Sequence, residues 1–360
     1  YLCVRRTASW EIPVGLLGAT WVMAQLAFWA GLTPFDGLRH VLSGAAIFGA
    51  FFIATDPVSS PLTGKGKFIF GMGIGVVVVH FGHPAPTADA LASVVDDPSS
   101  VPRMVVVVDN GDNLPPEFAP TGVDVLRSPT NLGYGTALNR GVERLQALGP
   151  FQGYLCLNND VRLVPGFLDA AAAALGEDAV GAVGGPIYED GQQSRIWYGG
   201  GSVNFILGAV RQEHGAEAAT RRRTVGFIPG TAMVVSSRAW QQLDGFDERY
   251  FLYHEDLDLC LRLRHAGWRL VFAPEMKAVH ALGGATGSHR RSPLYLEHMT
   301  RTRLMPFRPT AYRLYLAVVH SGWVLARAAA IVGSGGPDTR DKVAALLRGH
   351  AAALRGVFER

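Results

Sequence analysis

The chain has 360 residues, 33 Lys and Arg against 30 Asp and Glu, and a formal net charge of +3. So small a positive charge gives no indication of nucleic-acid binding, and the length predicts two or three structural units. The cysteines Cys3, Cys156 and Cys260 lie far apart and form no CxxC or Cys/His metal spacing, so we interpret them as packing residues of a reducing compartment.

The N-terminal part contains two apolar runs. Residues 12–32 carry no charge and have the length of a membrane-spanning helix, whereas residues 41–54 form a shorter run rich in Gly and Ala. Two arginines precede the first run and two lysines follow the second, so the positive-inside rule predicts that both flanks are cytoplasmic. We therefore predict a pair of transmembrane helices within residues 1–75. A buried helical hairpin in a soluble protein is the alternative.

Part of this segment resembles a known family, on residues Ser43-Gly44, Gly49–Ser59 and Gly66–Gly71. It is similar to the C-terminal part of the D subunit of Rnf-type ferredoxin:NAD oxidoreductases and to the related B subunit of sodium-pumping NADH:quinone reductases. The flavin-bearing Thr of those families lies upstream of the matched part. We therefore expect neither ion transport nor flavin binding from this segment.

A βαβ unit follows. Residues 76–79 and 104–108 are β-branched apolar runs, and residues 87–97 between them have a helical pattern. This spacing predicts a parallel sheet. Asp109 ends the second strand, where an acidic residue can accept hydrogen bonds from a nucleotide, and Asn110 follows it. An Asp-Asn-Gly turn is the alternative interpretation.

Two further stretches contain candidate ligand-binding residues. Residues 131–141 form a glycine-bearing loop that opens a helix, and such a junction suits a phosphate or sugar hydroxyls. The apolar run 154–157 ends abruptly in Asn158, Asn159 and Asp160. This pattern predicts a buried parallel strand with a ligand beyond its carboxyl end. Asp160 would then hold Mg²⁺ or Mn²⁺, since such cations need only one or two protein carboxylates. An Asn/Asp turn is the alternative.

The second chemical cluster is Glu255, Asp256 and Asp258, at the start of a predicted helix. Carboxylates stabilise the positive end of a helix, and this alone would explain them. Asp256, with Glu255 beside it, also supplies a carboxylate able to take a proton from an attacking hydroxyl. His280 ends another short apolar run, and a lone His is more often structural than a metal ligand.

The remaining stretches are less informative. Residues 182–223 contain polar loops, glycines and the basic run Arg221–Arg223. We expect this run to be a solvated face or to contact diphosphate or anionic lipid. Residues 306–360 alternate apolar and basic residues and predict C-terminal helices. Those helices would either cover an acceptor cleft or lie on a membrane surface.

Taken in order, these pieces resemble one family over residues 75–305, the family 2 inverting glycosyltransferases, in particular their bacterial rhamnosyl- and galactofuranosyl-transferase-like members. The matching pieces are Val105–Gly111, Asn131–Gly135 with Asn139 and Gly141, Leu157–Asp160, Pro229–Ala232, Gly245–Glu248, Phe251-Leu252, Glu255-Asp256, Asp258-Leu259, Arg262, Gly267, Pro274 and Val279-His280.

The resemblance implies a GT-A fold, that is, an α/β Rossmann-like mixed sheet flanked by helices, over residues 76–305. It also implies a nucleotide diphosphate-sugar donor, a glycan or lipid-linked acceptor and a divalent cation, Mn²⁺ or Mg²⁺. By position, Asp256 is the general base with Glu255 beside it, and Asp160 ligates the metal with His280 as a further ligand. The donor-binding positions are Asp109, Asn110, Asn131, Gly133, Asn139, Asn158 and Asn159.

Two departures from the family pattern stand out. His80-Phe81-Gly82 replaces the Thr-Tyr-Asn of many relatives, and the metal motif Asn158-Asn159-Asp160 has a single carboxylate, which implies modest metal affinity. The leading hypothesis is an enzyme of the inner membrane whose catalytic domain faces the cytoplasm. The alternative is a fragment of a membrane redox ion-pump subunit fused to a non-catalytic domain that binds sugar nucleotides.

Overall fold

The structure is a computed structural model, and it describes residues 21–30 except 23 and 28, then 73–118, 120–281, 292–336 and 338–358. The second predicted transmembrane helix and most of the first lie outside these residues. The chain divides into two compact units, residues 1–73 with 143–151 and residues 74–142 with 152–360. The second unit contains every candidate site residue and is described below.

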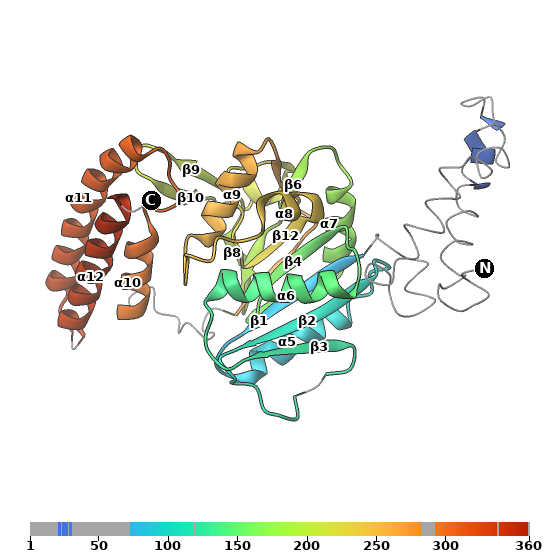
Figure 1. Ribbon diagram of the computed structural model, residues 1–360, viewed down its shortest axis with the longest axis horizontal. Coiled ribbons are helices and arrows are strands. Elements are labelled where there is room, and N and C mark those ends of the chain that lie inside the picture. Colours follow the sequence, from blue (N-terminus) through green and yellow to red (C-terminus); the bar gives the residue numbers. More distant parts are fainter. Residues whose placement is uncertain are drawn as a thin grey trace. The chain divides into compact units, whose positions relative to one another are not determined.

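The centre of this unit is an eight-stranded mixed sheet with the order β11-β13-β6-β12-β4-β1-β2-β3 (Figure 1). β1, β2, β3 and β4 run parallel, whereas β12 runs antiparallel to both β4 and β6. The strands are β1 Ile74–His80, β2 Arg103–Asn110, β3 Val123–Ser128, β4 Gly153–Asn158, β6 Val180–Gly184, β11 Arg223–Thr224, β12 Ala232–Ser236 and β13 Arg269–Phe272.

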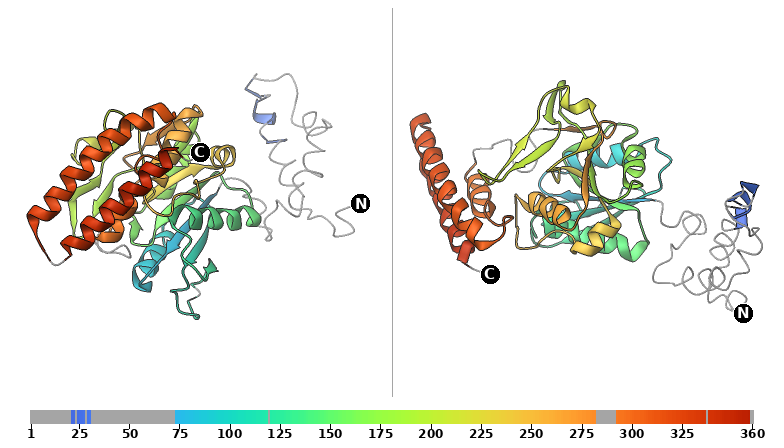
Figure 2. Two further views of the ribbon diagram at one scale, coloured as in Figure 1. Left: turned by 60° about the vertical axis from the view of Figure 1, so that its left-hand side comes forward. Right: turned by 90° about the horizontal axis from the view of Figure 1, so that it is seen from above.

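Helices α5 and α6 lie on opposite faces of the parallel part of the sheet (Figures 1 and 2). The valines of β1 and β2 are buried, as expected for strands covered on both faces. Gly141 on α6 lies so close to Val77 on β1 that a Cβ atom would clash. The helices of this core are α5 Pro84–Val95, α6 Tyr134–Leu148, α7 Phe167–Leu175, α8 Ser237–Leu243 and α9 Glu255–His265.

A second, four-stranded sheet is formed by segments that follow β4, β6 and β13 in the chain. Its order is β5-β14-β7-β8, and a separate hairpin consists of β9 and β10. The short helix η2 precedes β11. The bounds are β5 Val161–Leu163, β7 Ile187–Glu189, β8 Gln192–Tyr198, β9 Gly201–Asn204, β10 Ala209–Gln212, η2 Ala218–Thr220 and β14 Ala278–His280.

Three helices end the chain: α10 Pro293–Thr302, α11 Thr310–Ser334 and α12 Thr339–Phe358. Leu296, Val324 and Leu346 form a small apolar core among them, one residue from each helix. Within the described part of the chain, α11 is the one helix long and apolar enough to cross a membrane, by length and composition alone.

Most of the predicted elements are confirmed, among them the parallel βαβ unit and the strand before Asp160. The architecture is a mixed α/β sheet flanked by helices, as expected. Besides its polar loops, the stretch 182–223 contributes strands that the sequence did not predict, namely those from β7 to β10 and the last residues of β6. These strands are short and lie in mixed polar sequence, so they lack the apolar runs that identify β1, β2 and β4.

Candidate active site

Asp256 lies in the first turn of α9, and both of its carboxylate oxygens face backbone N–H groups. Oδ1 accepts a hydrogen bond from Leu257 N at 2.8 Å, and Oδ2 accepts one from Gly230 N at 3.1 Å. The residue as a whole is half-buried. Burial raises the pKa of Asp256 above its usual value, although the backbone hydrogen bonds oppose this shift. A carboxylate with a raised pKa is a stronger base than an exposed Asp.

Glu255, the neighbour of Asp256, is buried to a greater extent, with 5% of its surface exposed. Burial, and secondly the charge of Asp256, raises the pKa of Glu255 to about 8. Its Oε2 atom has no hydrogen-bond partner among the described residues, as suits a neutral carboxyl group. Of the two carboxyl groups, Asp256 is the one whose oxygens both accept backbone hydrogen bonds, and these bonds favour its ionised form.

The raised pKa of Glu255 predicts a pH-dependent contribution to stability. In the folded chain Glu255 keeps its proton up to about pH 8, whereas in the unfolded chain it loses it near 4.5. Because the folded state binds the extra proton, the stability from Glu255 is full below the lower value and is lost as pH rises towards the upper one. Glu255→Gln should therefore gain stability relative to the wild type between about pH 5 and pH 8, measured as unfolding midpoints. The exposed Glu117→Gln is the control, and equal pH dependence of Glu255→Gln and wild type would contradict the prediction.

Tyr134, at the start of α6, is joined to the same turn as Asp256. Its hydroxyl donates to Gly230 O at 2.7 Å, while Gly230 N donates to Asp256. Burial raises the pKa of Tyr134, and the nearby Cys156 thiol and the carboxylates of Glu255, Asp256 and Asp160 act in the same direction. Tyr134 is thus a neutral hydrogen-bond donor near both Asp160 and the pair Glu255-Asp256. Tyr134 lies within the glycine-bearing stretch 131–141, but it is not among the site residues predicted from the sequence.

Asp160 and His280 come together at the end of the smaller sheet. β14 pairs antiparallel with β5, which sets His280 opposite Val161, and Ala281 N donates to Asp160 O at 2.9 Å. His280 Nε2 lies 3.3 Å from Asp160 Oδ2, and both side chains are nearly buried. The Trp197 ring meets the His280 ring edge-on, with 5.1 Å between centroids. Two residues 120 positions apart are thereby held as one pair.

This pair fits a cation that takes few protein ligands. A carboxylate oxygen and an imidazole nitrogen are both ligands of Mn²⁺, and a cation of this class leaves its other positions to substrate phosphates. Elsewhere in the described residues, as here, no group of three or more His, Cys, Asp or Glu side chains is placed to hold a metal ion. A cation at Asp160 would therefore depend on the diphosphate of a donor for much of its coordination.

The two residues before Asp160 have contacts within the protein, Asn158 through its backbone and Asn159 through its side chain. Asn158 N donates to Thr231 O at 3.0 Å, which ties the end of β4 to the turn that contacts Asp256. Asn159 Nδ2 donates to Thr87 Oγ1 at 3.1 Å, and Thr87 in turn contacts His80 Nδ1 at 2.6 Å. Asn159 thus connects the metal motif to β1 and to the first turn of α5.

Asp109 is fully buried and its oxygens already have partners. They accept hydrogen bonds from Asn113 N at 2.8 Å, from Leu114 N at 3.2 Å and from the Arg127 guanidinium at 2.9 Å. These contacts fix the loop after β2 and the adjacent strand β3. In this structure Asp109 thus orders the loop and does not present a free carboxylate to a nucleoside.

Asn110, Asn131 and Gly133 form a second internal clamp. Asn110 Nδ2 donates to Asn131 Oδ1 at 3.0 Å and to Gly133 O at 3.2 Å, and its Oδ1 accepts from Leu132 N at 2.7 Å. Gly133 has φ +84° and lies so close to Phe251 O that no side chain would fit. The clamp holds the N-terminal end of α6 against the segment that precedes Asp256.

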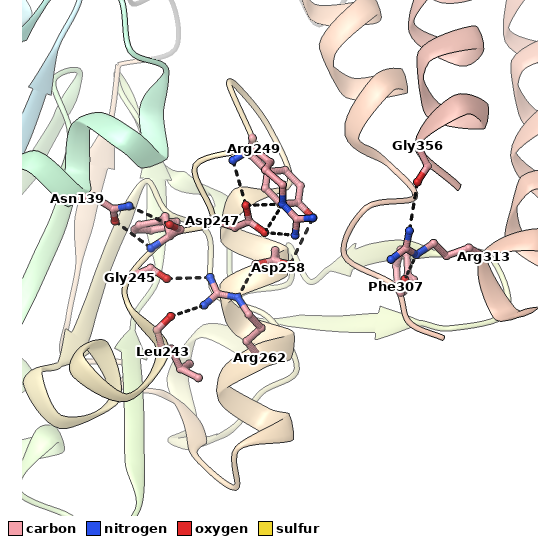
Figure 3. A network of polar contacts seen from close by, with 12 residues as sticks. Asn139, Leu243, Gly245, Asp247, Arg249, Asp258, Arg262, Phe307, Arg313 and Gly356 are labelled. Carbon is pink, nitrogen blue, oxygen red and sulfur yellow. Dashed lines mark hydrogen bonds and ion pairs between the residues drawn. The ribbon is translucent and has the colours of Figure 1, made fainter. Parts of the chain in front are cut away.

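Asn139 supports the same segment from the next turn of α6. Its amide exchanges hydrogen bonds with Phe246 N and Phe246 O, both at 2.9 Å. Arg262 donates to Asp258 at 2.6 Å and to the carbonyls of Leu243 and Gly245 at 3.0 and 2.8 Å (Figure 3). The turn between α8 and α9 is thus tied both to α6 and to α9 itself.

The two residues before α9 have strained backbones. Tyr253 has φ 68° and His254 has φ 66°, a left-handed conformation that costs on the order of 1–3 kcal/mol for each residue that is not Gly. Both are held by α10, through the Tyr295 ring at 5.2 Å from the Tyr253 ring and through Thr302 Oγ1 at 2.9 Å from His254 Nδ1. Burial lowers the pKa of His254 to about 3, so its ring is neutral. The C-terminal helices thereby help to position Asp256, a link the sequence analysis did not reveal.

The basic run is largely paired within the protein. Arg222 forms an ion pair with Glu177, and Arg223 forms one with Glu213 at 2.8 Å. Arg223 also donates to Gly199 O at 2.8 Å and lies over the Phe272 ring. These two guanidinium groups therefore stabilise the edge of the sheet and do not form an open site for a diphosphate.

Comparisons with known proteins match two families to different parts of the chain. The family described as NQR2, RnfD, RnfE matches residues 1–91, and the family described as Glycosyl transferase family group 2 matches residues 155–303. The D subunit of the ion-translocating oxidoreductase complex of Ectopseudomonas mendocina is 47% identical over 81 residues, 22% of this chain and 23% of that protein. The chain thus spans under a quarter of this relative, and the match confirms the resemblance inferred for the N-terminal segment.

A much longer match covers the region of the site. The N-acetylglucosaminyl-diphospho-decaprenol L-rhamnosyltransferase of Mycobacterium tuberculosis is 31% identical over 277 residues, 69% of this chain and 85% of that protein. Among solved structures, a mannosyltransferase from Pyrobaculum calidifontis in complex with GDP-Man and Mn²⁺ has a TM-score of 0.46 and 14% identity, and covers 97% of this chain and 99% of that one. With its extensive match to the mycobacterial relative, the chain belongs to glycosyltransferase family 2 and is a glycosyltransferase.

Proposed function

We propose that the chain is a metal-dependent, inverting enzyme that moves a rhamnose-like or galactofuranose-like sugar from a nucleotide diphosphate donor to a glycan or lipid-linked acceptor. The name of the mycobacterial relative supports the sugar and the acceptor class, since that protein is a rhamnosyltransferase acting on a diphospho-decaprenol. A catalytic domain over residues 76–305 with a helical extension over 306–360 remains part of the proposal. So does attachment of the N-terminal segment to the inner membrane, with the catalytic domain in the cytoplasm.

Asp256 is proposed as the general base. It takes the proton of the acceptor hydroxyl, while the acceptor oxygen attacks the anomeric carbon and the bond from that carbon to the diphosphate oxygen breaks. The nucleotide diphosphate leaves with the bonding electron pair, and one displacement inverts the anomeric centre. Support comes from the half-buried position of Asp256 and from the burial that raises its pKa. Glu255 is proposed to stay protonated, so that Asp256 is the one negatively charged member of this adjacent pair.

Asp160 and His280 are proposed as the metal ligands. A divalent cation bound there would neutralise the charge that develops on the leaving diphosphate. The chain's own contribution is to hold the two ligands together through the pairing of β14 with β5. The Tyr134 hydroxyl donates to Gly230 O. This bond is proposed to hold the turn that binds Asp256 in its position beside the end of β4.

The donor-binding role of the remaining candidates is proposed to be indirect for most of them. Asp109, Asn110, Asn131, Asn139 and Asn159 use their side chains within the protein and would shape the donor site by positioning its loops. Gly133 is proposed to act indirectly as well, because its N–H donates to Asn131 and its carbonyl accepts from Asn110. A direct donor contact is proposed for Asn158.

The strongest support for the proposal is the short hydrogen-bonded connection between the segment of Asp160 and Asp256. Asn158, two residues before Asp160, bonds to Thr231, and the adjacent Gly230 bonds to Asp256. The proposed base Asp256 and the proposed metal ligand Asp160, 96 positions apart in the chain, are thereby connected through one turn. A transfer reaction needs both roles in one site, a base for the acceptor hydroxyl and a cation for the leaving group.

The test is a donor screen on the full-length chain in detergent. Release of nucleotide diphosphate would be followed with UDP-, dTDP- and GDP-sugars, with Mn²⁺ or Mg²⁺, and with a short-chain N-acetylglucosaminyl-diphospho-prenol as acceptor. We expect release from one donor that requires both the cation and the acceptor. A folded protein that releases nothing across this panel would contradict the proposal.

A further inference from the structure

The outward face of α11 is apolar along its whole length. From residue 311 to residue 333 its exposed positions carry only Ala, Gly, Val, Leu and Tyr side chains, and they recur every three or four residues. Val318 and Leu325 are 73% and 69% exposed. These positions are Ala311, Leu314, Tyr315, Val318, Gly322, Leu325, Ala326, Ala329, Ala330, Val332 and Gly333.

The polar residues of α11 face the other way. Arg313 donates to the carbonyls of Phe307 and Gly356 at 2.8 and 3.2 Å (Figure 3). Ser321 Oγ lies 3.3 Å from His350 Nε2, and His320 is almost fully buried. A helix exposed to water normally presents its polar face outward, so α11 has the opposite arrangement.

The tip of the β9-β10 hairpin continues this face. Phe205, Ile206 and Leu207 at the tip are 47%, 70% and 51% exposed. The Tyr315 hydroxyl donates to Ile206 O at 3.1 Å, the Tyr312 hydroxyl donates to Phe205 O, and the two tyrosine rings stack. Helix and hairpin tip therefore form one apolar surface, here called the α11 face, with two tyrosines at their junction.

Charge is distributed unevenly between this region and the rest of the chain. Residues 292–358 contain nine Lys and Arg but only three Asp and Glu. The chain as a whole has a charge of only +3, so the remaining residues carry more acidic than basic side chains. Four basic residues belong to α12, which packs beside α11 (Figure 1). Arg348 forms an ion pair with Glu297 at 2.8 Å and Lys342 forms one with Asp338 at 3.6 Å. Arg340 and Arg355 are exposed and form no ion pair within the described residues. An apolar strip beside basic side chains suits the boundary between acyl chains and anionic headgroups.

We propose that the α11 face docks on the surface of an anionic lipid bilayer, with α11 lying in the plane of the interface. This deepens the proposed function, on which it rests, because it would bring the catalytic unit to the membrane that holds a lipid-linked acceptor. The apolar stretch of α11 is 22% buried, unlike the core helix of a soluble protein. A crossing orientation is disfavoured, because it would draw Arg313, Arg327 and the charges of α12 into hydrocarbon.

The test reads the local environment at single positions of the full-length chain. An environment-sensitive fluorophore would be attached to Val318→Cys, Leu325→Cys or Ile206→Cys in a Cys3→Ser background, since Cys156 and Cys260 are buried. Ala88→Cys on the exposed side of α5 is the control. On phosphatidylcholine vesicles containing phosphatidylglycerol, the first three labels should shift to shorter emission wavelengths and be quenched by lipid-attached quenchers, while the control should not.

Two results would overturn the proposal. One is a chain bound to vesicles whose labels at 318 and 325 keep the emission seen in water, which would show that another segment alone makes the attachment. The other is labels shielded before vesicles are added, which would show that a second copy or the chain's own N-terminal segment covers the face.

A double variant should lose insertion into the membrane. Val318→Glu with Leu325→Glu changes two exposed side chains, so folding should be retained, and it should reduce vesicle insertion of the Ile206 label about tenfold or more. Ala88→Glu is its control. Nucleotide release is measured separately from insertion, so failure of this proposal and failure of the proposed function are distinguishable.

Discussion

Asp256→Asn should reduce the rate of sugar transfer by a factor on the order of 10²–10⁴, the usual contribution of a positioned general base, and leave donor binding nearly unchanged. Asn has the shape of Asp and can still accept a hydrogen bond from Gly230 N or Leu257 N, so the turn before α9 should persist. What it cannot do is take the proton of an acceptor hydroxyl. The measurement is kcat under saturating donor and acceptor, beside a titration of the nucleotide.

Asp244→Asn is the matched control for this experiment. It removes the same charge from an exposed residue in the C-cap of α8, where φ is 57° and Asn tolerates the left-handed conformation. Its kcat should equal that of the wild type. If Asp256→Asn instead lost donor affinity while kcat changed little, Asp256 would be a donor-binding residue and another group would have to serve as the base.

The sequence was most informative where one local rule acts alone. The apolar runs before Asp109 and Asp160 identified two parallel strands and the edge at which they end, because strands covered on both faces are continuously apolar. The three carboxylates at the start of α9 likewise indicated where a helix begins. For these elements, the apolar pattern and the polar residues that end it are sufficient to predict the structure.

The roles of individual amides were not readable in this way. Asn110, Asn131 and Asn139 were predicted to bind a donor, but their side chains bond to neighbouring loops. An amide that contacts a ligand and one that clamps a loop have the same residue type and the same motif spacing. Only the tertiary position of Phe246 or of Gly133 decides between them.

Contacts between distant segments were equally hidden. No local pattern predicts that Tyr253 and His254 take left-handed conformations, since residues other than Gly rarely adopt them and even His, which does so more often than most, is found there in a minority of cases. The strain is held by Tyr295 and Thr302 on α10, more than 40 residues later in the chain. The pairing of His280 with Asp160 depends in the same way on the register of β14 and β5.

Asp160→Ala should remove the part of donor binding that depends on the cation. In the wild type, the affinity for a nucleotide diphosphate should rise when Mn²⁺ is added; in the variant that increment should fall by a factor on the order of 10–100 or disappear, because even the loss of supporting residues costs this much metal affinity. The single carboxylate of the motif makes the effect large, since His280 would be the one protein ligand left in the pair. The backbone hydrogen bond from Ala281 N to Asp160 O does not involve the side chain, so the strand pairing should survive.

The measurement is a nucleotide titration with and without Mn²⁺, and Asp89→Ala on the exposed side of α5 is the control for loss of a carboxylate. Affinity without the cation should be similar in wild type and both variants, because the loops that shape the donor site are clamped by Asn110 and Asn139 and not by Asp160. An undiminished Mn²⁺ increment in Asp160→Ala would mean that the cation binds elsewhere. The proximity of His280 to Asp160 would then be explained by packing against Trp197 alone.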